Sequence, residues 1–192
     1  MAKKIGVLAL QGDFQEHLQA LERLKAQGLE VRLPRELDGL DGIIIPGGES
    51  TTISRLMADF ALLEPLRKLV GEGLPLLGTC AGLILMARKA TDLALETLRV
   101  MDIEVKRNGF GRQVDSFETE LAIPALGEAP FPAVFIRAPI VEKVGPGVEV
   151  LARLPEGGPA AIRQKNLLAC TFHPELSSDL RLHAYFLSML SQ

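Results

Sequence analysis

A short apolar stretch that runs straight into a helical pattern constrains this chain more than any other feature. Residues 74–87 read Leu-Pro-Leu-Leu-Gly-Thr-Cys-Ala-Gly-Leu-Ile-Leu-Met-Ala. The apolar start is typical of a short strand covered on both faces. The turn Gly78-x-Cys80-x-Gly82 then has the pattern of a nucleophile elbow, with cysteine in the reactive position. Such a turn strains its central residue, and its glycines let strand and helix approach closely.

The elbow alone leaves two interpretations of Cys80 open. Its sulfur would lie at the amino end of a helix, where the dipole and free N–H groups favour a nucleophilic thiolate. A buried structural thiol is equally compatible, because free cysteine is among the most buried residue types. The far end of the chain favours the nucleophile, since an apolar strand at 167–172 is followed by His173-Pro174-Glu175. In an extended segment His173 and Glu175 share a side, which predicts a Cys-His-Glu triad.

The order of apolar and amphipathic segments predicts an α/β protein. We expect one domain over residues 1–192, with three α/β/α layers and a mostly parallel central sheet, because strands and helices alternate in the first half. Pro/Gly turns between short strand patterns predict antiparallel strands in the second half. The strands are expected at 5–10, 30–33, 41–45, 74–78, 103–106, 116–123, 134–139, 148–154, 160–164 and 167–172.

Helix boundaries follow from capping patterns. Asp13 is expected to cap a first helix, with Glu16 completing a capping box and Gly28 ending the helix. The elbow helix is expected to continue to about Lys89. Asp179 is expected to cap a terminal helix whose buried face carries Leu180, Ala184, Leu187 and Leu190.

A second glycine-rich turn follows another strand, at Pro46-Gly47-Gly48-Glu49-Ser50-Thr51-Thr52. Its exposed backbone N–H groups suit an oxyanion, although an ordinary strand-to-helix turn also fits the pattern. A phosphate loop is disfavoured, because the lysine of a Walker motif is missing. Active groups of parallel sheets gather beyond the carboxyl ends of the strands. We therefore expect the backbone N–H groups of Gly48 and Ala81 to form an oxyanion hole beside Cys80.

Composition excludes several classes of function. The formal net charge of -3 does not suggest nucleic acid or an anionic membrane surface as a partner, and no apolar stretch reaches the length of a membrane span. Two cysteines and three histidines, without metal-ligand spacing, make a zinc site improbable and suit a reducing cytoplasm. Cys170 is interpreted as a core residue, and His17 and His183 as packed or surface residues.

Five sequence blocks together resemble a known family. The elbow and Phe172-His173-Pro174-Glu175 are similar to the triad-type, class I glutamine amidotransferases. Three further blocks narrow the resemblance to the glutaminase subunits of ribose-phosphate-dependent pyridoxal 5′-phosphate synthase, nearly end to end. These blocks are Gly6-Val7-Leu8-Ala9-Leu10-Gln11-Gly12, Pro46 to Thr51, and Arg107-Asn108-Gly109-Phe110-Gly111-Arg112-Gln113-Val114-Asp115-Ser116-Phe117. Ile84 stands where many class I relatives have glutamine, in keeping with the narrower family.

The resemblance implies hydrolysis of L-glutamine to glutamate and ammonia through a cysteine thioester, without a cofactor or a metal. It implies a pyridoxal phosphate synthase subunit as partner, in a large ring assembly in the cytoplasm. It also implies that an isolated glutaminase is weakly active. Our hypothesis for the cause is a Gly47-Gly48 peptide that points its carbonyl into the oxyanion hole until the partner binds. Carried over by position, the residues expected to hold glutamine are Gly48, Glu49, Ser50, Arg107, Ile136 and Arg137.

Three other readings remain open on the sequence. The chain could supply ammonia to another synthase, for example an imidazole-forming one. It could be a cysteine hydrolase or peptidase on the same kind of sheet, although Arg107 and the Gly47-Gly48 block favour a small amino-acid substrate. It could also be a binding subunit without activity, although all three residue types of the triad are present.

Overall fold

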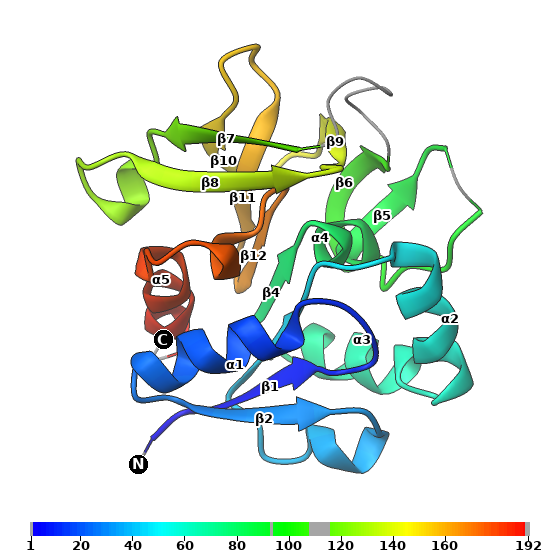
Figure 1. Ribbon diagram of the computed structural model, residues 1–192. Helices are drawn as coiled ribbons and strands as arrows, with labels where there is room; N and C mark the ends of the chain where they lie inside the picture. Colours follow the sequence, from blue (N-terminus) through cyan, green and yellow to red (C-terminus); the bar gives the residue numbers. More distant parts are fainter. Residues whose placement is uncertain (1, 93, 108–115, 191–192) are drawn as a thin grey trace.

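The computed structural model describes residues 2–92, 94–107 and 116–190, and it centres on a seven-stranded sheet (Figure 1). Part of the expected Arg107–Phe117 block, residues 108–115, lies outside the described residues. The strand order is β10-β11-β12-β4-β3-β1-β2. Its strands are β1 (Lys4–Leu8), β2 (Gln27–Val31), β3 (Gly42–Ile45), β4 (Leu76–Thr79), β10 (Glu149–Arg153), β11 (Pro159–Gln164) and β12 (Leu167–Cys170).

Five of these strands pair in parallel, and the remaining two join the sheet through antiparallel pairs. The pairs β1–β2, β1–β3, β3–β4 and β4–β12 run parallel, whereas β11 pairs antiparallel with β12 and β10 with β11. The prediction of a mostly parallel sheet with antiparallel strands in the second half is therefore confirmed. Two smaller sheets complete the molecule, β5 (Ala87–Ala90), β6 (Met101–Lys106) and β9 (Ile140–Val144) in one, and β7 (Ser116–Leu121) and β8 (Phe131–Ile136) in the other.

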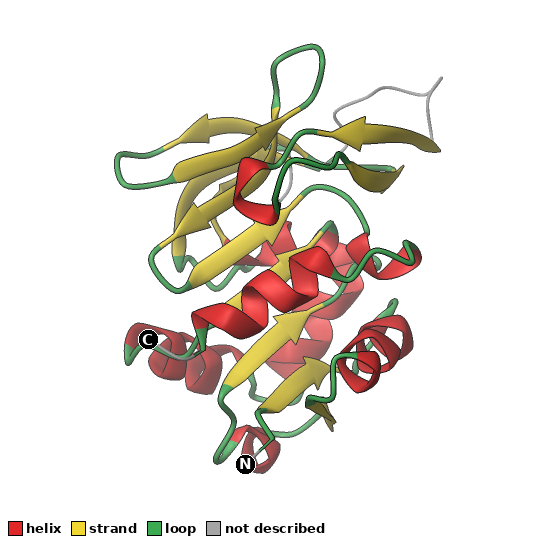
Figure 2. Cartoon of the chain, turned by 90° about the vertical axis from the view of Figure 1, so that its left-hand side faces the viewer, coloured by secondary structure: helices red, strands yellow, loops and turns green. Residues whose placement is uncertain are grey.

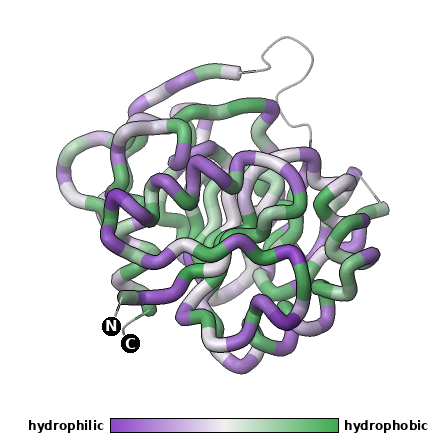
Figure 3. Tube along the Cα trace, turned by 60° about the horizontal axis from the view of Figure 1, so that its bottom comes forward, coloured by the Kyte–Doolittle hydropathy of each residue, from purple (hydrophilic) through white to green (hydrophobic). Residues whose placement is uncertain are grey.

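The central strands are buried on both faces, which explains their unbroken apolar sequences. Along β3, Ile43 and Ile45 belong to one core cluster, whereas Ile44 belongs to the other. The same alternation separates Leu76 from Leu77 in β4. In Figure 3 the hydrophobic segments accordingly concentrate in the middle of the molecule.

Helices form the layers on each side of this sheet, as Figure 2 shows. The first core cluster packs the sheet against α2 (Ser50–Asp59), α3 (Leu63–Gly71) and α4 (Ala81–Met86). The second packs it against α1 (Phe14–Arg23), α5 (Arg181–Met189) and the β7–β8 hairpin. Short 3-10 helices lie at η1 (Pro34–Leu37), η2 (Pro124–Leu126) and η3 (Pro174–Leu176). No helix within the described residues combines the length and the apolar character needed to cross a bilayer.

The predicted start of α1 is right, but its predicted capping box is wrong. Asp13 occupies the N-cap position without a side-chain capping hydrogen bond, because its carboxylate turns toward His173 instead. The predicted end at Gly28 is also wrong. The helix ends at Arg23, and Lys25 follows in the left-handed conformation with a φ of 59°, so that Gly28 lies in β2.

Two further boundaries differ from prediction because tertiary packing decided them. The elbow helix α4 stops at Met86 rather than near Lys89, and the next residues form β5 against β6. Strands β5 and β9 were not predicted. In α5 the buried residues are Leu182, His183, Phe186 and Met189, so the predicted buried face was wrong. Asp179 does accept the backbone N–H of Arg181, although α5 begins only after Leu180.

The elbow brings α4 into close contact with the carboxyl end of β3. A Cβ atom added at Gly82 would lie 2.0 Å from the carbonyl oxygen of Ile45. A backbone atom cannot move away as a flexible side chain can, so only glycine fits between this helix and this strand.

We expect Gly82→Ala to lower the free energy of unfolding by about 1–3 kcal/mol, the usual cost of forcing atoms into a packed core. Gly71→Ala at the end of α3 is the matched control, because a Cβ there meets no atom within 4 Å. That substitution should be neutral or stabilise by up to about 1 kcal/mol. Urea unfolding followed by circular dichroism measures both, and equal transition midpoints for the two variants would contradict the packing argument.

Candidate active site

Four adjacent parallel strands end at one edge of the central sheet. The strands β12, β4, β3 and β1 are neighbours in that order, and their carboxyl ends point the same way. The chain leaves them at His173, Cys80, Gly47 and Gln11, respectively, within a few residues of each strand end. The topology thus gathers the three predicted motifs, and the turn after β1, on a single rim.

The elbow has the strained geometry that its sequence predicts. Cys80 has φ 48° and ψ -104°, in a region that side chains rarely adopt. Its backbone N–H donates to the carbonyl of Cys170 on β12 over 2.9 Å, which anchors the tip of the elbow to the next strand. The Sγ atom lies 3.8 Å from the carbonyl oxygen of Ile136, at the end of β8. Cys80 is buried, with 6% of its surface exposed.

His173 and Glu175 form a close pair after β12. His173 Nδ1 and Glu175 Oε1 are 2.7 Å apart, and both residues are buried. The segment was predicted to be extended, but Pro174–Leu176 forms the 3-10 helix η3, so that detail is wrong while the predicted pairing is present. The backbone N–H of His173 donates to Val134 O over 2.8 Å, which fixes η3 to β8.

The imidazole of His173 also connects the pair to the elbow and to a second carboxylate. Asp13 Oδ2 lies 3.3 Å from His173 Nδ1, from the turn that follows β1. The side chain of Cys80 is near enough to the imidazole of His173 to act on its pKa. The structure therefore brings Cys80, His173 and Glu175 together and adds Asp13, whose only sequence signal is that of a helix cap.

Burial and hydrogen bonding shift the pKa values of His173 and Glu175 in opposite directions. Burial acts to lower the pKa of His173, but its hydrogen bonds with Asp13, Cys80 and Glu175 outweigh burial and raise that pKa well above its ordinary value. Burial raises the pKa of Glu175, and the hydrogen bond to His173 acts against this rise. A protonated His173 between anionic neighbours is the arrangement that stabilises a thiolate.

We do not interpret the cluster of Asp13, His173 and Glu175 as a metal site. Asp13, His173 and Glu175 place potential donor atoms within 4.8 Å of one another. However, His173 Nδ1 and Glu175 Oε1 already face each other at 2.7 Å, and this short contact needs a proton between them. We therefore assign the cluster to proton chemistry.

The glycine-rich turn after β3 packs directly on the imidazole. A Cβ atom at Gly47 would lie 2.4 Å from His173 Cε1, and the carbonyl of Gly47 accepts the backbone N–H of Asp13 over 3.0 Å. Gly48 has a φ of 156°, which L side chains rarely adopt, and a Cβ there would meet Gln11 Oε1 at 2.5 Å. Both glycines are thus required by close approach, not by the turn alone.

Glu49 stands at the N-cap position of α2, directly after the glycine-rich turn. Its carboxylate accepts the backbone N–H groups of Thr51 and Thr52 and the hydroxyl of Thr52, so it caps α2. The guanidinium of Arg107 lies 3.4 Å away and also donates to Thr51 Oγ1. Partial burial acts to raise the pKa of Glu49, but the bonds from Thr52 and Thr51 and the charge of Arg107 lower it to about 2.

The other predicted binding residues lie around the same rim. Ser50 is buried in the first turn of α2, and its Oγ atom has no hydrogen-bond partner among the described residues. Ile136 ends β8 beside Cys80, and Arg137 follows it with a φ of 44°. Ala81, the other expected oxyanion donor besides Gly48, opens α4 directly after Cys80.

Two histidines that were interpreted as packed or surface residues lie directly behind the triad. His17 on α1 and His183 on α5 are both fully buried, and their rings are joined by a 2.9 Å contact from His17 Nδ1 to His183 Nε2. His17 Nε2 lies 3.4 Å from Glu175 Oε2. Packing is confirmed for both, but no local sequence pattern indicates that His17 adjoins Glu175 or that His183 contacts His17.

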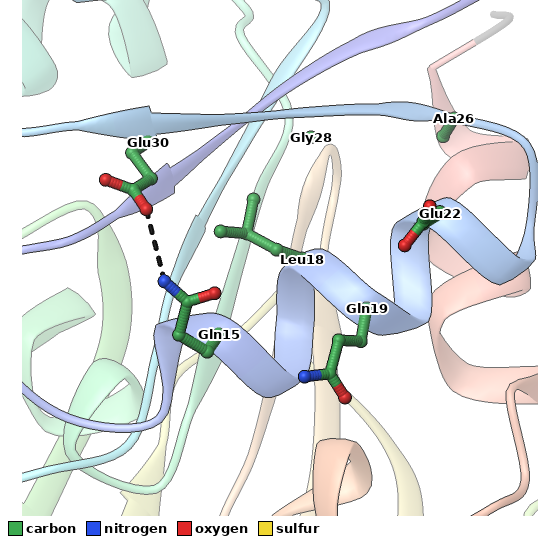
Figure 4. Close-up of a pocket in the computed structure, with 7 residues that line it drawn as sticks. All are labelled: Gln15, Leu18, Gln19, Glu22, Ala26, Gly28 and Glu30. Atoms are coloured by element: carbon green, nitrogen blue, oxygen red, sulfur yellow. Dashed lines mark hydrogen bonds between the residues drawn. The ribbon is translucent and has the colours of Figure 1, made fainter.

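A separate surface hollow lies between the outer side of α1 and β2 (Figure 4). Gln15 and Glu30 are joined across it by a 3.2 Å hydrogen bond. The residues that line it include no cysteine or histidine, so it lacks the groups of the predicted Cys-His-Glu triad. The rim at the carboxyl ends of the parallel strands therefore remains the candidate active site.

Comparison with known proteins shows the family of the chain. Residues 7–192 match the model of the SNO glutamine amidotransferase family. The chain belongs to this family. A crystal structure described as a glutamine amidotransferase superposes with a TM-score of 0.93 at 49% identity, covering 98% of this chain and 99% of that one.

Similar curated proteins are found in several bacteria. A Moorella thermoacetica protein named pyridoxal 5′-phosphate synthase subunit PdxT is 56% identical over 97% of this chain and 99% of its own length. A protein of the same name from Thermotoga petrophila is 51% identical, with 97% and 99% covered. The structure of PurLQS from Thermotoga maritima shares 15% identity at a TM-score of 0.76, which shows a common fold only.

The contribution of the Glu49 cap to the stability of this protein can be measured. We expect Glu49→Ala to lower the free energy of unfolding by about 0.5–2 kcal/mol at neutral pH, the usual cost of losing an N-cap. Because folding lowers the pKa of Glu49, its contribution is present above the ordinary value of 4.5 and is lost as the pH falls toward about 2.

Urea unfolding of both proteins at pH values above and within that window measures the effect. The matched control is Glu22→Ala on α1, an exposed glutamate whose removal should change stability by less than about 0.5 kcal/mol at either pH. A stability difference between wild type and Glu49→Ala that persists unchanged at low pH would contradict the capping role of the carboxylate.

Proposed function

We propose that this chain is the glutaminase subunit of a pyridoxal 5′-phosphate synthase. It hydrolyses L-glutamine to L-glutamate and ammonia in the cytoplasm, and it delivers the ammonia to a synthase subunit that builds pyridoxal 5′-phosphate. The observation that carries the proposal is that Cys80 and the His173–Glu175 pair follow adjacent parallel strands on one rim, in a chain of the SNO glutamine amidotransferase family. Relatives with 51–56% identity are named as PdxT subunits of that synthase.

The chemistry begins with attack of Cys80 Sγ on the side-chain amide carbon of glutamine. The S–C bond forms, the carbonyl oxygen takes up the electron pair, and His173 holds the proton that the thiol gave up. The backbone N–H groups of Gly48 and Ala81 would bind the resulting oxyanion, and one such donor is worth about 2.7–4 kcal/mol. His173 then protonates the amide nitrogen, the C–N bond breaks, and ammonia leaves a γ-glutamyl thioester on Cys80.

Water completes the cycle by hydrolysing the thioester. His173 removes one proton from the attacking water, the C–S bond breaks, and the proton returns to Cys80 Sγ as glutamate leaves. Glu175 stays ionised through both halves and keeps the imidazole in the correct orientation. Burial of Cys80 and His173 limits the number of water molecules that can reach the thioester.

The rim offers groups suited to the amino-acid end of glutamine. A guanidinium pairs well with a carboxylate, so Arg107 is proposed to bind the substrate carboxylate. The unpartnered Ser50 Oγ, and the backbone groups of Gly48, Ile136 and Arg137, are proposed to hold the remaining polar atoms. Because both oxygens of Glu49 already accept bonds at the start of α2, Glu49 acts mainly by holding Arg107 and the turn in place.

Ammonia has to reach its acceptor before water protonates it, because the ammonium ion is not a nucleophile. This requirement supports a partner that covers the rim while glutamine is hydrolysed. We propose a synthase subunit in this position, with glutaminase subunits arranged around a larger ring of synthase subunits.

Glutamate release measured by a coupled dehydrogenase assay, with the synthase subunit present, tests the triad. We expect Cys80→Ala and His173→Ala to lose at least about 10⁴-fold in kcat, and Glu175→Gln to lose less, as in other triads. Cys170→Ala is the matched control, because this fully buried second cysteine packs in the core and should retain turnover. Unchanged glutamine turnover in Cys80→Ala would refute the proposed function.

The role of the partner is tested by comparing turnover with and without the synthase subunit. The Gly47 carbonyl is held by the N–H of Asp13, so reorientation of the Gly47-Gly48 peptide requires this bond to break. Two adjacent glycines make such a change inexpensive, and partner binding can drive it. We expect the synthase subunit to raise kcat for glutamine, and equal rates with and without it would rule out activation by the partner.

A further inference from the structure

The two buried histidines behind the triad are not used by the chemistry described above. His17 Nδ1 lies 2.9 Å from His183 Nε2. His17 Nε2 lies 3.2 Å from Thr79 Oγ1 and 3.4 Å from Glu175 Oε2. His183 Nδ1 has no hydrogen-bond partner among the described residues. A continuous line of polar atoms thus runs from α5 through α1 to the side of Glu175 that faces away from His173.

Glu175 is surrounded by titratable groups from several elements. His173 faces Oε1 from the same segment, and Asp13 contributes a negative charge from the turn after β1. On β12, Cys170 is close enough to be affected by the charge of Glu175. From α1, His17 Nε2 lies 3.4 Å from the outer oxygen Oε2, which has no hydrogen-bond partner in the described part of the chain.

Burial favours the neutral form of both histidines. Burial, followed by the neighbouring His183 and His173, lowers the pKa of His17 well below its ordinary value. Burial lowers the pKa of His183 to about 4. In its neutral form each ring carries one N–H donor and one acceptor nitrogen. Because the two rings contact each other, the position of the proton on one ring determines its position on the other.

Only one assignment of these two protons leaves no buried donor unpaired. If His183 Nε2 carries its proton, it donates to His17 Nδ1, and His17 then carries its own proton on Nε2, toward Thr79 and Glu175. The single nitrogen left over is His183 Nδ1, an acceptor without a proton.

The opposite assignment is unfavourable at both ends of the line. His17 Nδ1–H would donate to His183 Nε2, which forces the His183 proton onto the unpartnered Nδ1 and buries an orphan N–H. It would also point the lone pair of His17 Nε2 at the carboxylate of Glu175, 3.4 Å away. The contacts therefore select the tautomer that offers Glu175 a donor.

We propose that His17 is a positioning residue of the catalytic triad, which holds the outer oxygen of Glu175 through its Nε2–H, and that His183 fixes the required tautomer of His17. This inference rests on the proposed glutaminase function for its kinetic consequences, but not for the proton assignment itself. Glu175 is then held at both oxygens, by His173 on the catalytic side and by His17 on the other. The carboxylate cannot rotate away from His173 without losing the second contact.

The proton assignment can be tested without any assay of activity. Side-chain nitrogen NMR of the protein with isotope-labelled histidine, between about pH 6 and pH 8, distinguishes a protonated ring nitrogen from a bare one. We expect Nε2 of both His17 and His183 to be protonated and both Nδ1 atoms to be bare. A His17 with its proton on Nδ1, or with protons on both nitrogens, would overturn the proposal.

Kinetics of glutamine hydrolysis with the synthase subunit present test the consequence for the triad. We expect His17→Leu to lower kcat by roughly 10–100-fold, the range known for loss of a partner behind a metal-bound histidine. The KM should change little, because His17 is directed at Glu175 and not toward the predicted glutamine-binding residues. Loss of a donor disfavours the ionised carboxylate, so the acid limb of the kcat/KM profile should move up by about one pH unit.

A conservative variant and a packing control separate positioning from folding. His17→Gln keeps a neutral N–H donor near the same place and should restore most of kcat and return the acid limb toward its wild-type position. Leu21→Ala, one turn further along α1, leaves a cavity without touching Glu175, so it should lower the melting temperature and leave the acid limb in place.

The outcomes also separate this inference from the proposed function. If wild-type protein does not turn over glutamine with its synthase subunit, the proposed function fails, while the NMR result still decides the proton assignment. If the wild type is active and folded His17→Leu has an unshifted acid limb, or if Leu21→Ala shifts it equally, the positioning role is refuted.

Discussion

The parallel pairing of β4 with β12 is the constraint on which the candidate site depends. Cys170 lies opposite Thr79 in this pairing, so the residues that leave the two strands start from the same level of the sheet. A one-residue slip would turn the side chains of a strand to opposite faces and separate Cys80 from His173. The hydrogen bond from Cys80 N to Cys170 O ties the strained elbow to this register. Because both strands are apolar on both faces, packing above and below the sheet holds the register in place.

Features whose physical cause is local could be predicted from the sequence. The elbow requires glycine on both sides of Cys80, and the alternation of strands and helices requires a mostly parallel sheet, so the shared rim followed from topology alone. The His173–Glu175 contact was also predictable, because only one residue separates the pair. Boundaries that depend on distant packing could not be predicted. Helix α4 ends at Met86 because the chain after it joins the β5–β6–β9 sheet, and no short-range sequence pattern indicates this pairing.

The residues behind and beside the triad escaped prediction for the same reason. Asp13 carries an ordinary N-cap signal, and nothing nearby indicates that its carboxylate points to a histidine far along the chain. His17 and His183 lie 166 positions apart in the sequence. Each lies in an amphipathic helix, where a buried histidine is interpreted as a packed core residue. A histidine on the buried face of α1 was the one available signal, since a core position with a polar ring needs a polar partner. Sequence alone does not identify that partner.

The two ends of the triad differ in their access to water, and this difference suits hydrolysis of a thioester. The side chain of Glu175 is fully enclosed, and its burial would be costly without the hydrogen bond between Oε1 and His173. Asp13, on the other flank of His173, is 38% exposed. The imidazole therefore stands between a dry carboxylate that cannot move and a wetter one that can exchange its hydrogen bonds. In the proposed mechanism the enclosed side orients the imidazole toward Cys80, and the exposed side leaves it open to water. The chain thus supplies orientation from the sheet interior and access from the loops, so the same imidazole can serve successively as acid and base.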